Sequence, residues 1–212
     1  MHKPLRKVVF IDRDGVINVD LWKYVEHWKE FRFEKGVLDA LKVLTDKGFD
    51  IFIISNQAGV GDGIFTEAAM WQVHEKMVKA MEKKGIKIKG ARYCTHGKKA
   101  KCDCRKPKTQ LLEKAVALTH FDKKATFFVG DKLSDLEAGK NFGIRTILVR
   151  TGYGAETEKK LTKALQPAHI VDNLKAAGVD LPAPRAPVAN YVPFVITGNL
   201  LFISGQVSNG PE

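Results

Sequence analysis

Two carboxylates stand two residues apart in Asp12-Arg13-Asp14-Gly15, directly after the apolar run Val8–Ile11. Side chains with this spacing just beyond a strand can point into one crevice, because Gly15 lets the backbone turn away at once. Such a pair suits a bound cation, or a nucleophile and an acid whose pKa values are pushed apart. A polar strand end or an Asx turn is the plainer interpretation, and this segment alone leaves both open.

Three further polar clusters lie at the ends or starts of predicted elements. Residues 55–61, from Ser55 to Gly61, offer a hydroxyl, two amides and flexible backbone N–H groups that can cradle a phosphate. Arg105-Lys106-Pro107 sets two cations ahead of a helix start. Residues 130–135 place Asp131 at a strand tip and Asp135 one helical turn later. The ordinary alternatives are a plain loop for residues 55–61, surface charge for Arg105-Lys106-Pro107, and for Asp135 an acid that favours the start of a helix. A functional interpretation is open as well, because ligands of open α/β sheets bind where strands end.

The three cysteines of the chain stand close to one histidine. Cys94-x-His96 and Cys102-x-Cys104 supply three thiolates and one imidazole within eleven positions. This donor set suits a tetrahedral structural Zn²⁺ with no position left open for catalysis. The metal would fix the lysine-rich loop between the two pairs and position the cations that follow it. Unrelated or buried thiols are the alternative.

These clusters need a frame of alternating strands and helices. Strands are predicted at 8–11, 49–54, 91–94, 126–129, 146–149 and 169–171, and helices at 37–44, 66–81, 111–118, 133–141, 156–165 and 173–177. Repeated βα units imply a mostly parallel sheet with helices on both faces, a Rossmann-like three-layer α/β sandwich.

The composition changes near residue 178, where we divide the chain into a main domain, 1–178, and a tail, 179–212. Five of the eight prolines fall in the last 31 residues. Residues 191–204 read as two strands joined by Gly198-Asn199, a hairpin. An isolated hairpin is marginally stable, so the tail is docked on the main domain, paired with another chain, or a fragment of something larger.

The 212 residues include 44% hydrophobic residues and carry a net charge of +11. The sequence has no apolar run long enough to span a membrane and no signal peptide, so we expect a cytoplasmic protein. Thirteen basic residues against two acidic ones between Lys76 and Lys108 account for the net charge. Such a patch attracts nucleic acid or a phosphorylated small molecule, but the segment lacks interleaved aromatics for base stacking.

Taken in order, the four polar clusters resemble the motifs of the haloacid dehalogenase (HAD) superfamily of phosphotransferases. Asp12-x-Asp14-Gly15 resembles the first motif, Ser55 the second, Lys106 the third and Gly130-Asp131-x-x-x-Asp135 the fourth. The cysteines and histidine running into Arg105-Lys106-Pro107 narrow the likeness to subfamily IIIA, the branch of the D-glycero-D-manno-heptose 1,7-bisphosphate and histidinol-phosphate phosphatases. The likeness spans roughly residues 5–177 and is nearer to the heptose enzymes.

The resemblance implies a Mg²⁺-dependent phosphatase with an aspartyl-phosphate intermediate. Asp12 is then the nucleophile, Asp14 the acid and base, and Ser55 and Lys106 stabilise the phosphoryl oxygens. Asp135 orients Lys106 or a metal-bound water. The expected Mg²⁺ ligands are Asp12, Asp131 and the backbone carbonyl of Asp14. The expected substrate contacts are Arg13, Asn56, Gln57, Ala58, Arg105 and Lys132.

The expected substrate is a small phosphorylated sugar, heptose 1,7-bisphosphate, which would be converted to heptose 1-phosphate. Histidinol phosphate or another small phosphomonoester is the alternative, followed by a polynucleotide phosphatase or a zinc-stabilised nucleic-acid-binding module. We expect a monomer. The tail resembles the opening hairpin of the Rid (YjgF) family of imine deaminases, which would make it a partial domain or a way to recruit a Rid-like partner. A catalytically dead scaffold would leave the intact carboxylate motifs unexplained.

Overall fold

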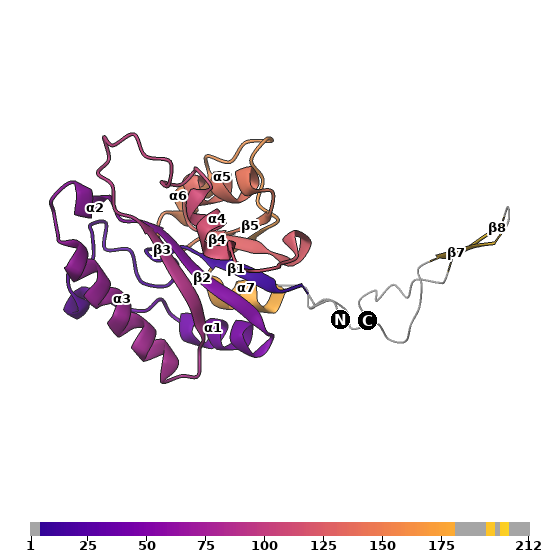
Figure 1. Cartoon of the computed structure of the whole chain (residues 1–212), viewed down its shortest axis with the longest axis horizontal. Coiled ribbons are helices and arrows are strands. Elements are labelled where there is room, and N and C mark those ends of the chain that lie inside the picture. Colours follow the sequence, from indigo (N-terminus) through magenta and orange to yellow (C-terminus); the bar gives the residue numbers. More distant parts are fainter. Residues whose placement is uncertain (1–4, 181–193, 198–199, 204–212) are drawn as a thin grey trace. The chain divides into compact units, whose positions relative to one another are not determined.

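The computed structural model describes residues 5–180, 194–197 and 200–203 (Figure 1). The chain separates into two units, Met1–Leu181 and Pro182–Glu212, each described by itself. The strands of the first unit are β1 (Lys7–Ile11), β2 (Phe49–Asn56), β3 (Ile88–Cys94), β4 (Phe127–Gly130), β5 (Arg145–Val149) and β6 (His169–Val171). Its α-helices are α1 (Val37–Asp46), α2 (Ala58–Gly61), α3 (Glu67–Glu82), α4 (Gln110–Val116), α5 (Leu133–Phe142), α6 (Gly154–Glu158) and α7 (Leu174–Asp180), with 3₁₀ turns at Trp28–Glu30 and Lys123–Ala125.

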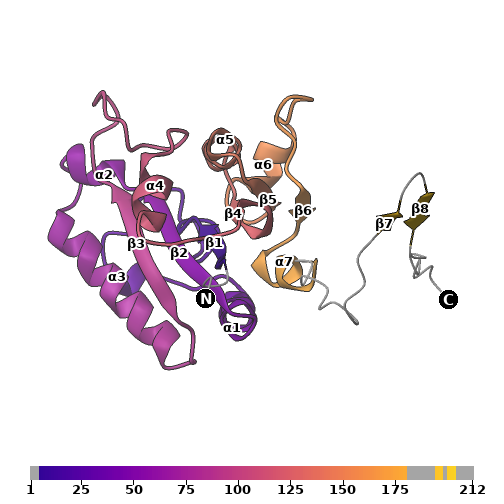
Figure 2. The ribbon, with the colours of Figure 1, turned by 45° about the vertical axis from the view of Figure 1, so that its right-hand side comes forward.

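The six strands form one parallel sheet in the order β3-β2-β1-β4-β5-β6, and Figure 2 shows them side by side in this order. The chain moves outward from β1 to β3, then crosses back to β4 and moves outward to β6. The order therefore reverses between β1 and β4, where the loops after the two strands part and leave a crevice. The polar clusters that begin with Asp12 and Asp131 follow these two strands. The predicted α/β sandwich is confirmed.

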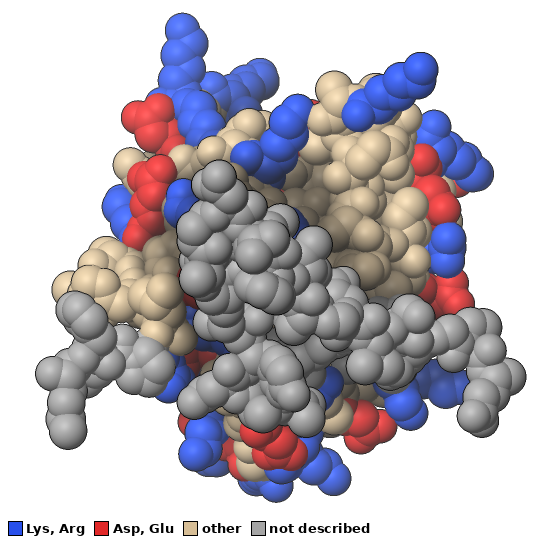
Figure 3. All heavy atoms as spheres, turned by 90° about the vertical axis from the view of Figure 1, so that its right-hand side faces the viewer, with Lys and Arg blue, Asp and Glu red and all other residues tan. Residues whose placement is uncertain are grey.

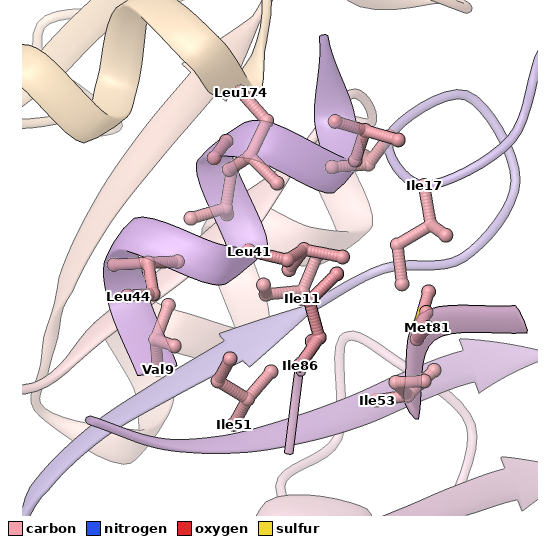
Figure 4. Close-up of a cluster of buried hydrophobic side chains, with 14 of the residues drawn as sticks. Val9, Ile11, Ile17, Leu41, Leu44, Ile51, Ile53, Met81, Ile86 and Leu174 are labelled. Carbon is pink, nitrogen blue, oxygen red and sulfur yellow. The ribbon is translucent and has the colours of Figure 1, made fainter. Parts of the chain in front are cut away.

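Alternate residues of each central strand face opposite sides of the sheet. Val9 and Ile11 of β1 pack in a cluster with residues of α1, α3 and α7, whereas Val8 and Phe10 pack with residues of α4 and α5. Figure 4 shows the first cluster, with Leu41 and other side chains of α1 over β1 and β2. Because both faces are covered, the strands read as continuous apolar runs rather than as an alternation.

Local signals account for the ends of the longest helix. The Thr66 hydroxyl accepts a hydrogen bond of 3.1 Å from the Ala69 N–H, which caps the start of α3. Gly85, just past the other end, has a φ of 72° in the left-handed region that favours glycine. Between them Met70, Val73 and Met77 lie buried on one face.

Two predicted helices are shorter than their sequence pattern indicates. The helix predicted over 156–165 ends at Glu158, and Thr162 and Leu165 instead form an isolated bridge. No residue between 159 and 165 is buried, so this stretch has no apolar face to hold it against the sheet. The helix predicted over 111–118 ends at Val116, and Leu118 is fully exposed beyond it.

In the second unit, β7 (Phe194–Thr197) pairs antiparallel with β8 (Leu200–Ile203), with Phe194 opposite Ile203 and Thr197 opposite Leu200. The two predicted strands are thus confirmed over these residues. The predicted Gly198-Asn199 turn and the rest of the predicted hairpin lie outside the described residues. No helix in the described part of the chain is both long and apolar enough to cross a membrane.

Candidate active site

A buried lysine sits between two buried carboxylates at the carboxyl ends of the central strands. The Lys106 Nζ lies 3.0 Å from Asp12 Oδ1 and 2.6 Å from Asp135 Oδ1, and it donates to the Ile54 carbonyl at 2.9 Å. Burial acts to lower the pKa of Lys106, but the two carboxylates outweigh it and hold that pKa above its ordinary value. Lys106 is therefore a fixed cation in direct contact with Asp135, and the role of Asp135 in orienting it or a metal-bound water stays a prediction.

Asp131 joins this group from the end of β4. One carboxylate oxygen from each of Asp12, Asp131 and Asp135 lies within 4.8 Å of the others. Asp131 Oδ2 accepts from the Tyr153 N–H at 2.8 Å, while the buried Oδ1 accepts no hydrogen bond from the described residues. Burial raises the pKa of Asp131 well above its ordinary value. A hard divalent cation would satisfy that oxygen and stabilise the charged carboxylate, so the donor set fits Mg²⁺.

Gly15 allows the two loops to approach each other. Its φ is 86°, in the left-handed region, and a Cβ there would collide with the Asp131 carboxylate. The Thr151 hydroxyl donates to the Gly15 carbonyl at 2.6 Å and ties the loop after β1 to the loop after β5. A side chain at residue 15 would thus push apart the loops that carry the carboxylates.

Asp14 is held by three donors. The Arg13 guanidinium reaches both of its oxygens at 2.9–3.1 Å, Gln57 Nε2 donates to Oδ2 at 2.7 Å, and Asn18 Nδ2 donates to Oδ1 at 3.1 Å. Burial acts to raise the pKa of Asp14, but Arg13, Gln57 and Asn18 together hold it below its ordinary value. Asp14 is therefore ionised in this arrangement. Gln57 Nε2 also donates to the Ser55 hydroxyl at 3.1 Å, which links the first two motifs.

The side chain of Asn56, which follows Ser55 of the second motif, binds the backbone of Lys106, the residue of the third motif. This side chain accepts from the Lys106 N–H and donates to the Lys106 carbonyl, both at 3.1 Å. This two-way bond holds residue 106 beside the end of β2, although the two residues are 50 positions apart in the sequence. The structure therefore brings all four predicted clusters to one edge of the sheet.

A cavity of about 350 Å³ opens over this edge. Its lining residues are Asp12, Asp14, Asp20, Trp22, Lys23, Tyr24, Ser55, Asn56, Ala58, Lys98, Arg105, Lys106, Lys132, Ser134 and Tyr153. Of the predicted substrate contacts, Asn56, Ala58, Arg105 and Lys132 line it. Arg13 and Gln57 are fully buried outside the lining and bind Asp14 instead. Their direct contact with substrate remains a prediction.

The cavity is also lined by residues that are not among the predicted site residues, including Asp20, Lys98 and Tyr153. Asp20 Oδ2 lies 3.3 Å from Lys132 Nζ, and that ammonium lies 4.6 Å from the centre of the Tyr153 ring. Tyr153 could have been predicted from the sequence, because it closely follows β5 and ligands of open α/β sheets bind where strands end. Asp20 and Lys98 lie in long loops, which gave no such signal.

The cysteine and histidine side chains converge as their spacing predicts. Ligand atoms of Cys94, His96, Cys102 and Cys104 lie within 4.8 Å of one another, with the Cys94 and Cys104 sulfurs 3.2 Å apart. Three thiols and an imidazole at this range can hold a metal ion. Arg105 donates to the backbone carbonyls of His96 and Gly97, so the cluster also positions that guanidinium at the cavity.

Comparisons with known proteins agree with this arrangement. A HAD-hydrolase-like family model matches residues 103–177. The chain is 40% identical over 165 residues to the D-glycero-beta-D-manno-heptose-1,7-bisphosphate 7-phosphatase of Haemophilus ducreyi, covering 73% of this chain and 90% of that one. Its counterpart in Escherichia coli K12 is 38% identical over 152 residues, which cover 68% of this chain and 79% of that one.

A solved structure agrees as well. The D,D-heptose 1,7-bisphosphate phosphatase of B. bronchiseptica, crystallised with magnesium and phosphate, superposes with a TM-score of 0.77 at 30% identity. The match covers 82% of this chain and 97% of that one. The comparisons give no support to a Rid-like tail. On the shared sequence and fold, the chain belongs to the HAD-like phosphatases, which are phosphoric monoester hydrolases.

Proposed function

We propose that the protein hydrolyses D-glycero-beta-D-manno-heptose 1,7-bisphosphate and releases the phosphate from C7. The observation that carries this proposal is the similarity to a relative named for that activity. The two sequences are 40% identical over a stretch that covers 90% of the relative. The cavity is consistent with it, because five cationic side chains and three carboxylates line a space suited to a small anionic ligand.

In the proposed first step, a carboxylate oxygen of Asp12 attacks the phosphorus and the bond from phosphorus to the sugar oxygen breaks. The products are an aspartyl-phosphate and the sugar alcohol. The Arg13 N–H at 2.7 Å and Lys106 Nζ at 3.0 Å both contact Asp12 Oδ1, so they fix the direction of the carboxylate. Lys106 and the Ser55 hydroxyl then face the charge that develops on the phosphoryl oxygens.

Asp14 exchanges the proton in both steps. Its protonated form gives a proton to the departing sugar oxygen, and its carboxylate then takes a proton from the water that hydrolyses the aspartyl-phosphate. The donors around Asp14 favour the ionised form that the second step needs. Protonation for the first step requires that the bonds from Arg13 and Gln57 loosen when substrate binds.

Two metals complete the proposal. Asp12, Asp131 and the backbone carbonyl of Asp14 would hold Mg²⁺, which when bound offsets the repulsion between carboxylate and phosphate, about 4 kcal/mol per charge pair at roughly 4 Å and an effective dielectric of about 20. Cys94, His96, Cys102 and Cys104 would hold a structural Zn²⁺, the metal that three thiolates and an imidazole favour.

Two further proposals concern the whole chain. Residues 1–178 form the phosphatase domain and 179–212 a separate tail, since every residue that lines the cavity lies before residue 178. The phosphatase works as a monomer in this proposal, and the elution volume of the full chain in size-exclusion chromatography tests it.

The test is phosphate release with Mg²⁺ from both anomers of heptose 1,7-bisphosphate, histidinol phosphate and a 5′-phosphorylated oligonucleotide. We expect the beta anomer to give the highest kcat/KM. Asp12→Asn should abolish turnover while circular dichroism shows the fold intact, because asparagine keeps the shape and cannot form the aspartyl-phosphate. Preference for histidinol phosphate or the oligonucleotide would overturn the substrate assignment, and an active Asp12→Asn would overturn the nucleophile.

A further inference from the structure

Trp22 has a backbone conformation that tryptophan rarely adopts. Its φ is 60°, and it is the one non-glycine residue with a positive φ in the described part of the chain. Its side chain is 66% exposed, so the strain is not explained by burial of the ring in the core. An observed backbone outlier of this kind is a reason to look for a functional contact.

The conformation of Trp22 is fixed by contacts at the rim of the cavity. Its backbone N–H donates to Asp20 Oδ1 at 2.7 Å, and its ring lies 4.6 Å from the Tyr153 ring at an interplanar angle of 74°. The other oxygen of Asp20 contacts Lys132, whose ammonium lies over the Tyr153 ring. The four residues thus hold each other in place before any substrate binds.

The Trp22–Tyr153 pair joins two loops that are far apart in the sequence. Trp22 belongs to the loop after β1, and Tyr153 follows β5. Both rings line the same cavity as Asp12 and Lys106. A ligand whose phosphate reaches Asp12 therefore has the rest of its body within reach of an aromatic surface.

We propose that Trp22 and Tyr153 form an aromatic wall that receives the sugar ring of the substrate and selects phosphates on a closed ring over open-chain phosphates. This inference rests on the proposed function. The C–H bonds on one face of a pyranose are apolar and carry a slight positive charge, which suits the negative face of an aromatic ring. An open-chain polyol presents no such rigid face and must be ordered when it binds.

The sharpest variant is Trp22→Gly. Glycine adopts a φ of 60° at no steric cost and keeps the backbone N–H that donates to Asp20, so this change removes the ring and leaves the backbone conformation available. Trp22→Phe keeps an aromatic ring at the same place. Trp71→Ala is the matched control, because Trp71 is also partly exposed, at 38%, and does not line the cavity.

The two substrates compared are heptose 1,7-bisphosphate and mannitol 1,6-bisphosphate, which carries two terminal phosphates on an open six-carbon chain. We expect Trp22→Gly to raise KM for the heptose about tenfold, with kcat and the KM for the mannitol compound within about twofold of wild type. Trp22→Phe should restore most of the loss, and Trp71→Ala should match wild type. Equal effects on both substrates, or no effect on either, would overturn the wall.

A binding measurement separates this inference from the proposed function. The two bisphosphates are titrated into Asp12→Asn protein by isothermal titration calorimetry, with and without the Trp22→Gly change. Binding of the cyclic sugar that weakens about tenfold with Trp22→Gly, with binding of the open-chain compound unchanged, supports the wall, even if the wild type releases no phosphate and the proposed function fails. A cyclic sugar that binds equally well in both proteins refutes the wall while leaving any measured turnover intact.

Discussion

Lys106 is a fully buried cation that lies between two buried carboxylates at the active site. The side chains of Lys106, Asp12 and Asp135 are each 5% exposed or less, so water screens their charges little. Without the lysine, Asp12 and Asp135 would face each other with like charges in a poorly solvated site. In the proposed mechanism the same ammonium group stabilises both the fold and the charge that develops on a phosphoryl group.

Replacing Lys106 by methionine should affect both properties. We expect Lys106→Met to lower the free energy of unfolding by about 3–5 kcal/mol, because breaking a buried ion pair leaves charge uncompensated. Phosphate release should fall below detection. Urea unfolding without added Mg²⁺ measures the first effect, since a bound cation would mask it. Lys42→Met removes a lysine of an exposed ion pair and should change stability by less than about 0.5 kcal/mol. Equal stability of the two variants would contradict the argument.

We propose that Gln57 also acts on the reaction through Asp14. Its Nε2 donates to Asp14 Oδ2 and to the Ser55 hydroxyl, and its amide oxygen accepts from Arg13. Gln57→Leu should therefore lower kcat about tenfold or more, while KM changes little. Loss of a donor to the carboxylate also raises the pKa of Asp14, so the alkaline limb of the kcat/KM profile, where Asp14 loses the proton that the first step needs, should move to higher pH. An unchanged pH profile would show that Gln57 only packs.

At the scale of secondary structure, strand ends were predictable and side-chain partners were not. Continuous apolar runs such as Val8–Ile11 mark buried parallel strands, and the polar residue that follows each run marks its carboxyl end. Periodicity places residues on faces but says nothing of rotamers. Arg13 therefore looked like a substrate ligand by sequence, whereas the structure turns its guanidinium toward Asp14 and Gln57. The residues next to Arg13 in the sequence do not indicate that its charged guanidinium is fully buried.

The loop that links β3 to α4 is the element in which we propose a structural metal. Its lysine-rich centre is exposed, and its ends meet through the cysteine and histidine side chains and through the bonds from Arg105 to the His96 and Gly97 carbonyls. Stripping the proposed zinc with a chelator and restoring Mg²⁺ should raise KM markedly with a smaller change in kcat, because Arg105 is bonded to the backbone of this loop. Metal content and kinetics are measured on the same samples, and Cys102→Ser should behave like the stripped protein. Zinc-free protein with wild-type KM would refute the structural role.

For the whole molecule, the net charge of +11 comes from residues 76–108, where thirteen basic residues stand against two acidic ones. On the face that Figure 3 presents, acidic and basic side chains are interspersed. Five of the thirteen basic residues have a setting that explains them. Lys89 and Arg92 are exposed on β3, the edge strand of the sheet, where charges discourage pairing with another chain. Lys98, Arg105 and Lys106 line the cavity. The other eight belong to neither setting, so the edge strand and an anionic ligand explain only part of the excess charge.

The last prediction concerns the division of the chain. Both hydrophobic clusters and all residues that line the cavity lie between residues 8 and 177. A protein shortened to residues 1–181 should therefore keep kcat/KM within about twofold and Tm within about 2 °C of the full chain, because no described contact of the core or the site is removed. The two proteins are compared by phosphate release, calorimetry and size-exclusion chromatography. Aggregation or inactivity of the shortened protein would mean that the tail docks on the phosphatase domain, and a changed elution volume beyond the mass difference would mean that the tail joins two chains.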